Sequence, residues 1–173
     1  MPSSEAAAGK FQDLAALWSI GEATPTDVVD GACDALVAGL DSPALRMLAA
    51  CTRAEAASDV PDLLPPALDE LGLVFHPVDS VSGLEAATRV LAARLLAGEL
   101  TPRELTRQVH WHCGHRVPLA QPLAALDDDY DNVYGSLGYI PRPEAEIDAE
   151  VRAEAKRLVD RSAPPPERPS PGA

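Results

Sequence analysis

Three of the four histidines lie in the six-residue segment 110–115, His-Trp-His-Cys-Gly-His. Imidazole nitrogens and thiolates are common zinc ligands, so this segment is the first candidate for a metal site. On one helix, His112 and His115 are three residues apart and lie on the same face, which makes them the candidate metal-binding pair. The chain has no Cys-x-x-Cys or His-Glu-x-x-His pattern. A zinc ion would therefore need a further ligand from His76, Cys33, Cys51 or an acid elsewhere.

The same segment also has a simpler interpretation as the end of a helix. Leu105, Val109 and Cys113 follow at four-residue steps and predict its buried face. Gly114 is typical of a helix end, where a histidine suits the negative pole of the helix dipole. We therefore expect a structural histidine cluster without a cofactor. A surface whose charge responds to pH is an alternative, because histidines titrate near neutrality.

A cysteine nucleophile is the second chemical possibility in this segment. The thiol of Cys113 would need a base beside it, and His110 is the histidine at an adjacent helical position. Neighbours on one helix seldom give the geometry of a nucleophile, its base and an orienting group. The predicted core position favours an inert buried thiol, so we expect no catalytic residue.

An acidic run follows the histidines at residues 127–131, Asp-Asp-Asp-Tyr-Asp. Its alternating acids match the start of an EF-hand loop, but Asn132 replaces the turn glycine and Gly138 replaces the bidentate glutamate. Acids beside tyrosines favour contact with a basic partner, whereas the alternative is that the rings pin an irregular connection onto the helices. The candidate partner-binding residues are Asp127, Asp128, Asp129, Tyr130, Asp131 and Tyr134.

The composition of the 173 residues excludes several classes of function. A formal net charge of −13 without any basic run argues against DNA, RNA and anionic membranes as partners. The same charge favours a basic protein or a cation, and it also maintains solubility. The chain shows no secretory signal, no apolar run long enough for a membrane span and no disulfide framework. We expect a reduced cytoplasmic protein, whose oligomeric state, homo-oligomers included, stays open.

The elements that must position these residues are predicted to be helices. Caps such as Thr24-Pro25 and Thr101-Pro102 precede apolar residues that recur every three or four positions. Only residues 73–78 suggest an extended segment. We expect helices near residues 10–20, 25–39, 43–52, 62–72, 83–97, 102–115 and 144–161, with Leu91, Leu95, Val109 and Leu158 buried.

The predicted fold is all-α, a single compact domain of about six or seven helices over residues 10–161. Residues 1–9 are expected to be a flexible N-terminus, and residues 162–173 a disordered proline-rich tail. Two helical hairpins should be similar, because Gly-Glu-Ala-Thr-Pro at residues 21–25 reappears as Gly-Glu-Leu-Thr-Pro at residues 98–102. Either duplication or convergence on good turn chemistry explains this similarity.

Residues 39–49, Gly-Leu-Asp-Ser-Pro-Ala-Leu-Arg-Met-Leu-Ala, follow the first of these hairpins. With that hairpin, the segment resembles part of a group of small uncharacterised helical proteins of GC-rich bacteria. The resemblance implies a helical fold and carries no known activity.

These features predict a non-catalytic, acidic protein-interaction module inside the cell. Such a module would neutralise or regulate a basic partner, as immunity and antitoxin-type proteins do. The alternative is a small metal-assisted hydrolase that uses the His110–His115 cluster and an acid from residues 127–131.

Overall fold

Several helices begin where the sequence supplies a cap. The side chains of Ser3, Thr24, Ser42 and Thr101 each accept a hydrogen bond from a backbone N–H in the first turn of the helix that follows. Thr24 and Thr101 form complete capping boxes, with Asp27 and Glu104 as the returning acids. The capping signals at Thr24, Ser42 and Thr101 therefore predict the starts of three helices to within a residue or two. The first helix instead begins at Ser4, within residues 1–9, which were expected to be a flexible N-terminus.

The computed structural model describes residues 3–132 and 142–161. Helices are the only regular secondary structure in these two ranges, as predicted. They number eight: α1 (Ser4–Ser19), α2 (Pro25–Val37), α3 (Pro43–Ala49), α4 (Ala56–Glu70), α5 (Val81–Leu96), α6 (Pro102–Cys113), α7 (Gln121–Asn132) and α8 (Glu144–Asp160). None of the helices in the part that the structure describes is long and apolar enough to cross a membrane.

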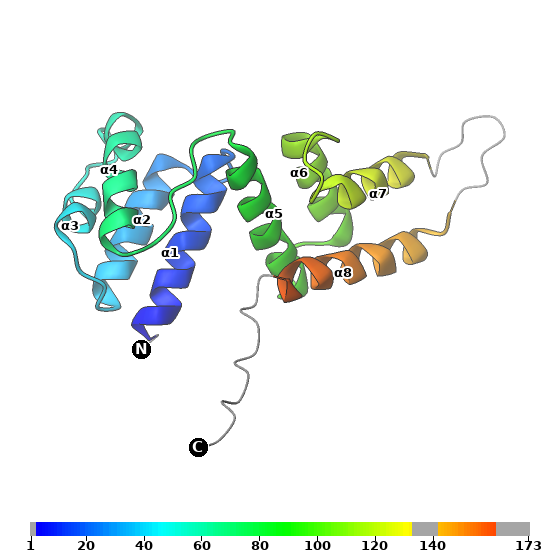
Figure 1. The fold of residues 1–173 in the computed structure, drawn as a ribbon, viewed down its shortest axis with the longest axis horizontal. Helices are drawn as coiled ribbons and strands as arrows, with labels where there is room; N and C mark the ends of the chain where they lie inside the picture. The colour runs from blue at the N-terminus through cyan, green and yellow to red at the C-terminus, as the bar shows by residue number, and fades with distance from the viewer. Residues whose placement is uncertain (1–2, 133–141, 162–173) are drawn as a thin grey trace, which may run out of the picture. The chain divides into compact units, whose positions relative to one another are not determined.

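The chain forms two compact units, an N-terminal unit (Met1–Val90) and a C-terminal unit (Leu91–Ala173), where the sequence predicted one domain. In the N-terminal unit, α2 packs against α1, α3 and α4, and α3 packs against α4 (Figure 1). Its core is rich in leucine, valine and alanine around a single phenylalanine. The fully buried side chains there include Val28, Leu45, Leu48, Leu64 and Leu68.

In the C-terminal unit, α6, α7 and α8 pack against one another. Each helix contributes fully or almost fully buried side chains, namely Leu105 and Val109 from α6, Leu123 from α7, and Ile147, Val151 and Leu158 from α8. The boundary between the two units falls within α5. The burial predicted for Leu91, Leu95, Val109 and Leu158 is confirmed.

Helix α7 is the element that the sequence analysis missed, and it raises the count above the predicted six or seven. None of the predicted helices covers the acidic run, which forms the second half of this helix. Leu123, Leu126 and Tyr130 are buried at helical spacing. An apolar face therefore runs through the acidic segment and holds it as a helix.

Helix α4 begins at Ala56, six residues earlier than predicted, and contains Pro61, Pro65 and Pro66. Each internal proline removes a backbone hydrogen bond and costs about 3 kcal/mol in an isolated helix. Val60 and Leu64 are fully buried on the inward face. Burial of this face outweighs the local cost of the prolines.

The predicted extended segment at residues 73–78 forms no strand. Instead, the side chain of Gln12 replaces a strand partner at Val74. Its Nε2 donates to the Val74 carbonyl at 2.8 Å, and its Oε1 accepts from the Val74 N–H at 2.7 Å. Phe75 then packs near Trp18, with ring centroids 6.5 Å apart. The segment is thus fixed to α1 by one amide side chain and an aromatic contact.

We predict different effects on stability for two neighbouring leucines of α5. Leu95 is buried and Leu96 is 46% exposed. Leu95→Ala should lower the free energy of unfolding by about 2–5 kcal/mol, because it leaves a cavity. The matched variant Leu96→Ala should lower it by less than about 1 kcal/mol. Urea titration followed by circular dichroism measures both, and equal losses would contradict the assigned inward face of α5.

Candidate functional site

The end of α6 decides where the histidines lie. Gly114 caps the helix with a φ of +53°, and its N–H donates to the His110 carbonyl at 2.8 Å. This left-handed backbone conformation favours glycine. On a continuous helix, residues 110 and 115 would lie about 140° apart around the axis. Because the chain turns at Gly114, the rings of His110 and His115 instead meet at a centroid distance of 5.0 Å.

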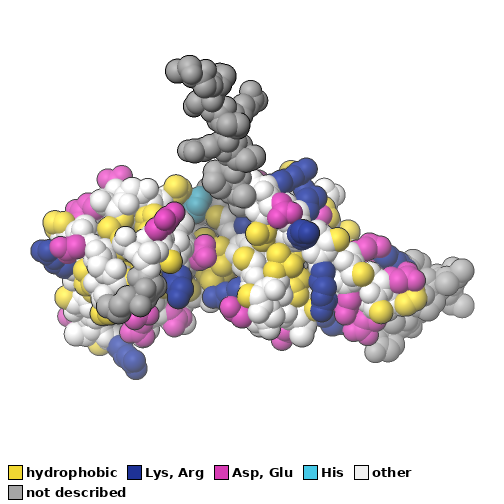
Figure 2. All heavy atoms as spheres, turned by 90° about the horizontal axis from the view of Figure 1, so that it is seen from below, with side chains coloured by type: hydrophobic (Ala, Val, Ile, Leu, Met, Phe, Trp, Pro, Cys, Tyr) yellow, Lys and Arg dark blue, Asp and Glu magenta, His cyan; other side chains and the backbone are white. Residues whose placement is uncertain are grey.

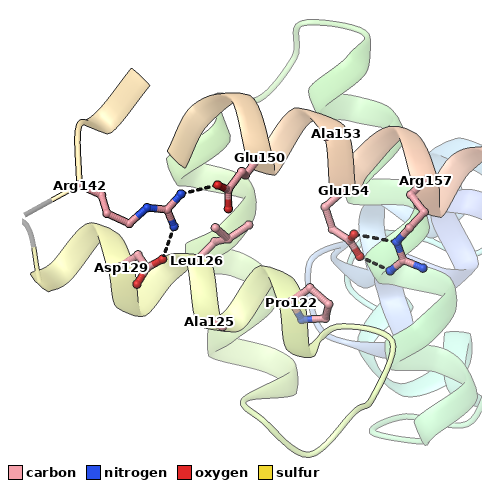
Figure 3. Close-up of a pocket in the computed structure, with 9 residues that line it drawn as sticks. All are labelled: Pro122, Ala125, Leu126, Asp129, Arg142, Glu150, Ala153, Glu154 and Arg157. Atoms are coloured by element: carbon pink, nitrogen blue, oxygen red, sulfur yellow. Dashed lines mark hydrogen bonds and ion pairs between the residues drawn. The ribbon is translucent and has the colours of Figure 1, made fainter. Parts of the chain in front are cut away.

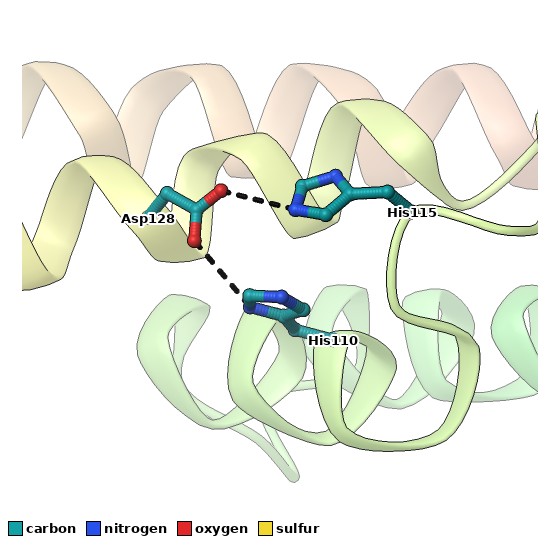
Figure 4. A group of neighbouring side chains, drawn as sticks. All are labelled: His110, His115 and Asp128. Atoms are coloured by element: carbon teal, nitrogen blue, oxygen red, sulfur yellow. Dashed lines mark ion pairs between the residues drawn. The ribbon is translucent and has the colours of Figure 1, made fainter.

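Helix α7 brings a carboxylate to these two rings. Asp128 Oδ2 lies 3.2 Å from His115 Nε2, and Asp128 Oδ1 lies 3.8 Å from His110 Nδ1 (Figure 4). One ligand atom from each of the three residues lies within 4.8 Å of the other two. We call His110, His115 and Asp128 the His-His-Asp cluster. Its donor set, two imidazoles and one carboxylate, is one that divalent transition-metal ions prefer.

A second carboxylate orients the His110 ring. Asp127 Oδ2 lies 2.9 Å from His110 Nδ1, and Asp127 Oδ1 accepts a hydrogen bond from the Thr106 hydroxyl at 3.0 Å. Thr106 is fully buried, so it holds the Asp127 carboxylate in place from the core. Asp127 thus faces the same ring nitrogen, Nδ1, as Asp128 does.

The candidate metal pair His112 and His115 is not the pair that the structure brings together. In the described residues, the metal-ligand group contains His115 with His110 and Asp128. The pairing of His112 with His115 assumed a helix through residue 115, whereas α6 ends at Cys113. Cys113 itself is buried with Leu105 and Val109, as the four-residue spacing predicted. Gly114 was the signal for the correct grouping, and Asp128 had no local signal because it comes from another helix.

The four acids of the predicted partner-binding run face bases of their own unit. Asp127 and Asp128 contact the histidines. Asp129 Oδ2 lies 2.8 Å from Arg142 Nη1, and Asp131 Oδ1 lies 3.2 Å from Arg103 Nη2. These carboxylates therefore link α7 to its neighbours within the chain.

Tyr130 lies in the core of the C-terminal unit, where it is fully buried. Its hydroxyl donates to Asp148 Oδ1 on α8, and the Arg103 guanidinium lies 5.2 Å from the centroid of its ring. Burial, and then the Asp148 carboxylate, raise the pKa of Tyr130 well above its usual value, so the phenol stays protonated. The tyrosine pins α7 against α8, and it does so from within a helix and not from the irregular connection that the alternative interpretation assumed. Tyr134 lies outside the described residues.

A groove of about 530 Å³ lies between α7 and α8 (Figure 3). Arg142 bridges Asp129 on α7 and Glu150 on α8, and Arg157 pairs with Glu154 one turn away on α8. The rest of the lining is mainly apolar, from Pro122, Ala125, Leu126 and Ala153. Since its charged groups already pair with one another, the groove joins two helices and offers little charge to a ligand.

The excess negative charge belongs to the N-terminal unit. Residues 1–90 contain 14 acidic and four basic side chains, a net charge of −10. Residues 91–173 contain 13 acidic and ten basic side chains, a net charge of −3. Exposed acidic side chains are visible on the face that Figure 2 shows. The negative field is therefore stronger around the N-terminal unit than around the C-terminal unit.

The exposed face of α2 combines charge with apolar surface. Asp30 and Asp34 are exposed one turn apart, and Val37 follows them with 75% of its surface exposed. On α3, which packs against α2, Met47 is 60% exposed. The Cys33 thiol also donates to the Ala49 carbonyl at 3.5 Å, which ties this face of α2 to the end of α3. We call Asp30, Asp34, Val37 and Met47 the α2–α3 surface.

Comparisons with protein-family models, with curated proteins and with solved structures find no match to this chain. The function must therefore be inferred from the residues and their geometry.

We predict that Tyr130 stabilises the fold through its hydroxyl. Tyr130→Phe keeps the buried ring but leaves Asp148 without its donor, so it should lower the free energy of unfolding by about 1–3 kcal/mol. Asp148→Asn retains an acceptor for the hydroxyl and should lower it less. Chemical denaturation of both variants measures the difference, and a Phe variant as stable as the parent would remove this role.

Proposed function

We propose that the protein is an acidic interaction module that binds a basic protein partner inside the cell. The observation that carries this proposal is the concentration of negative charge in the N-terminal unit, whose net charge is −10. Such a field accelerates encounter with a basic partner and repels nucleic acid and anionic membranes. Neutralising or regulating that partner, as immunity and antitoxin-type proteins do, is the biological role that fits this chemistry best.

The α2–α3 surface is the contact that we assign to the partner. The carboxylates of Asp30 and Asp34 would attract the basic partner. Val37 and Met47 supply exposed apolar area that would be buried on binding. Interfaces gain most of their affinity from a few such apolar contacts and most of their association rate from charges at the rim. The surface offers both within two packed helices.

The acids of residues 127–131 are the weaker candidates for partner contact. An incoming base would have to displace His110, His115, Arg142 or Arg103 from carboxylates that they already contact. Each exchange would replace one ion pair by another and gain little free energy. For this reason we move the proposed contact from α7 to the N-terminal unit.

The two similar hairpins accord with a module built from a repeated unit. Gly21 and Gly98 share a φ of +80°, and the capping boxes of Thr24 and Thr101 have the same form. We propose that residues 21–25 and 98–102 are corresponding turns of that repeat.

We predict that charge neutralisation on α2 slows binding of a basic partner. The partner is captured from the native cells with the full chain, purified, and tested by surface plasmon resonance at several salt concentrations. The double variant Asp30→Asn, Asp34→Asn should lower the association rate constant and flatten its salt dependence. Val37→Ser should instead speed dissociation at least about fivefold, a loss of about 1 kcal/mol.

The matched control is Glu146→Gln with Asp160→Asn, which removes the same charge from exposed positions of α8. This control should leave association close to that of the parent. The proposal fails if the full chain binds no basic protein saturably, or if the control slows association as much as the α2 variant does.

The alternative function, a metal-assisted hydrolase, depends on whether the His-His-Asp cluster binds an ion. That cluster belongs to the C-terminal unit and the α2–α3 surface belongs to the N-terminal unit, so the two functions depend on different residues and can be tested separately.

A further inference from the structure

We propose that His110, His115 and Asp128 form a binding site for a divalent first-row transition-metal ion, for which zinc is the probe. The proposal rests on the geometry of the His-His-Asp cluster and is independent of the partner-binding function. It also revises the expectation that the histidines are purely structural and carry no ion.

The spacing of the cluster suits a small ion. Zinc bonds to imidazole nitrogen or carboxylate oxygen are about 2.0–2.2 Å long, so ligand atoms in a tetrahedral site lie about 3.3 Å apart. Asp128 contacts His115 Nε2 at 3.2 Å and His110 Nδ1 at 3.8 Å. One ligand atom from each of the three residues lies within 4.8 Å of the other two, so side-chain movements of up to about 1.5 Å would bring the three atoms to the ideal separation.

The chemistry of the neighbours distinguishes Asp128 from the other acids of α7. Asp129 and Asp131 face arginines, which are cations and cannot bind a metal. Asp128 faces two imidazoles, each of which becomes a ligand once an ion takes the place of its proton. Two histidines, His110 and His115, thus meet at one carboxylate of the four-acid run.

The cluster is held in place by its neighbours in the chain and is open to solvent. Asp127, held by the buried Thr106 hydroxyl, orients the His110 ring, and the left-handed turn at Gly114 directs His115 back towards α7. About half of the surface of the His115 and Asp128 side chains is exposed, at 49% and 48%. An ion can therefore enter from solvent and keep water in the coordination positions that the three residues leave open.

The bound ion would cross-link the segment after α6 to the middle of α7. Three ligands from two helices and a turn would then hold the C-terminal unit together at the point where α6 ends. The expected consequence is a higher melting temperature with zinc, since an ion that binds only the folded chain stabilises it.

The test is calorimetric titration of zinc chloride into the chelator-treated full chain. We expect saturable binding of one ion per chain, and Co(II) absorption bands of tetrahedral or five-coordinate form that zinc abolishes. His115→Asn and Asp128→Asn should each weaken binding by at least about 100-fold, because loss of a ligand should exceed the 10–100-fold effect typical of an outer-shell partner.

His112→Asn is the matched control, because it removes the same side chain from the same segment but lies outside the cluster. It should leave zinc affinity and the zinc-dependent rise in melting temperature unchanged. His115 follows the end of α6 and is half exposed, so its variant should keep the circular dichroism of the parent. The proposal is overturned if the parent binds no zinc saturably, if zinc binding survives His115→Asn and Asp128→Asn, or if His112→Asn abolishes it.

Discussion

The C-terminal unit depends on the pairing of the α7 carboxylates with bases from neighbouring segments. Acids in sequence repel one another, and a helix that carries four of them near its end gains nothing from its own dipole there. His110 and Arg103 from α6, His115 from the turn and Arg142 before α8 face these acids. The buried Tyr130 adds a hydrogen bond to Asp148 on α8. The charges thus select which helices α7 packs between.

Local signals explain why so much of the helical fold could be predicted from the sequence. The capping boxes at Thr24 and Thr101 mark where two helices begin. The spacing of Leu91 and Leu95 correctly predicts the inward face of α5. Helix α7 was missed because three consecutive aspartates dominate the pattern and hide the apolar spacing of Leu123, Leu126 and Tyr130. The division into two units has no local signal, because it depends on which apolar faces meet.

The candidate site shows the same division between local and long-range information. The sequence identifies the histidines and the acids as the chemically dense segments, and Gly114 marks the turn between them. It does not show that Asp128, rather than another acid, meets both rings, because this follows from the packing of α7 on α6. A partner-binding surface is harder still to predict from the sequence, because an aspartate can attract either another protein or a base of its own chain.

The contact between Gln12 and Val74 bears on how residues 73–75 could pair with a further strand. Val74 and Phe75 are strong β-formers, and a segment of this kind with unpaired backbone groups is a template for pairing with other chains. The amide of Gln12 occupies both backbone groups of Val74, at 2.8 and 2.7 Å. One polar side chain of α1 therefore occupies the two backbone groups through which Val74 could join an intermolecular sheet.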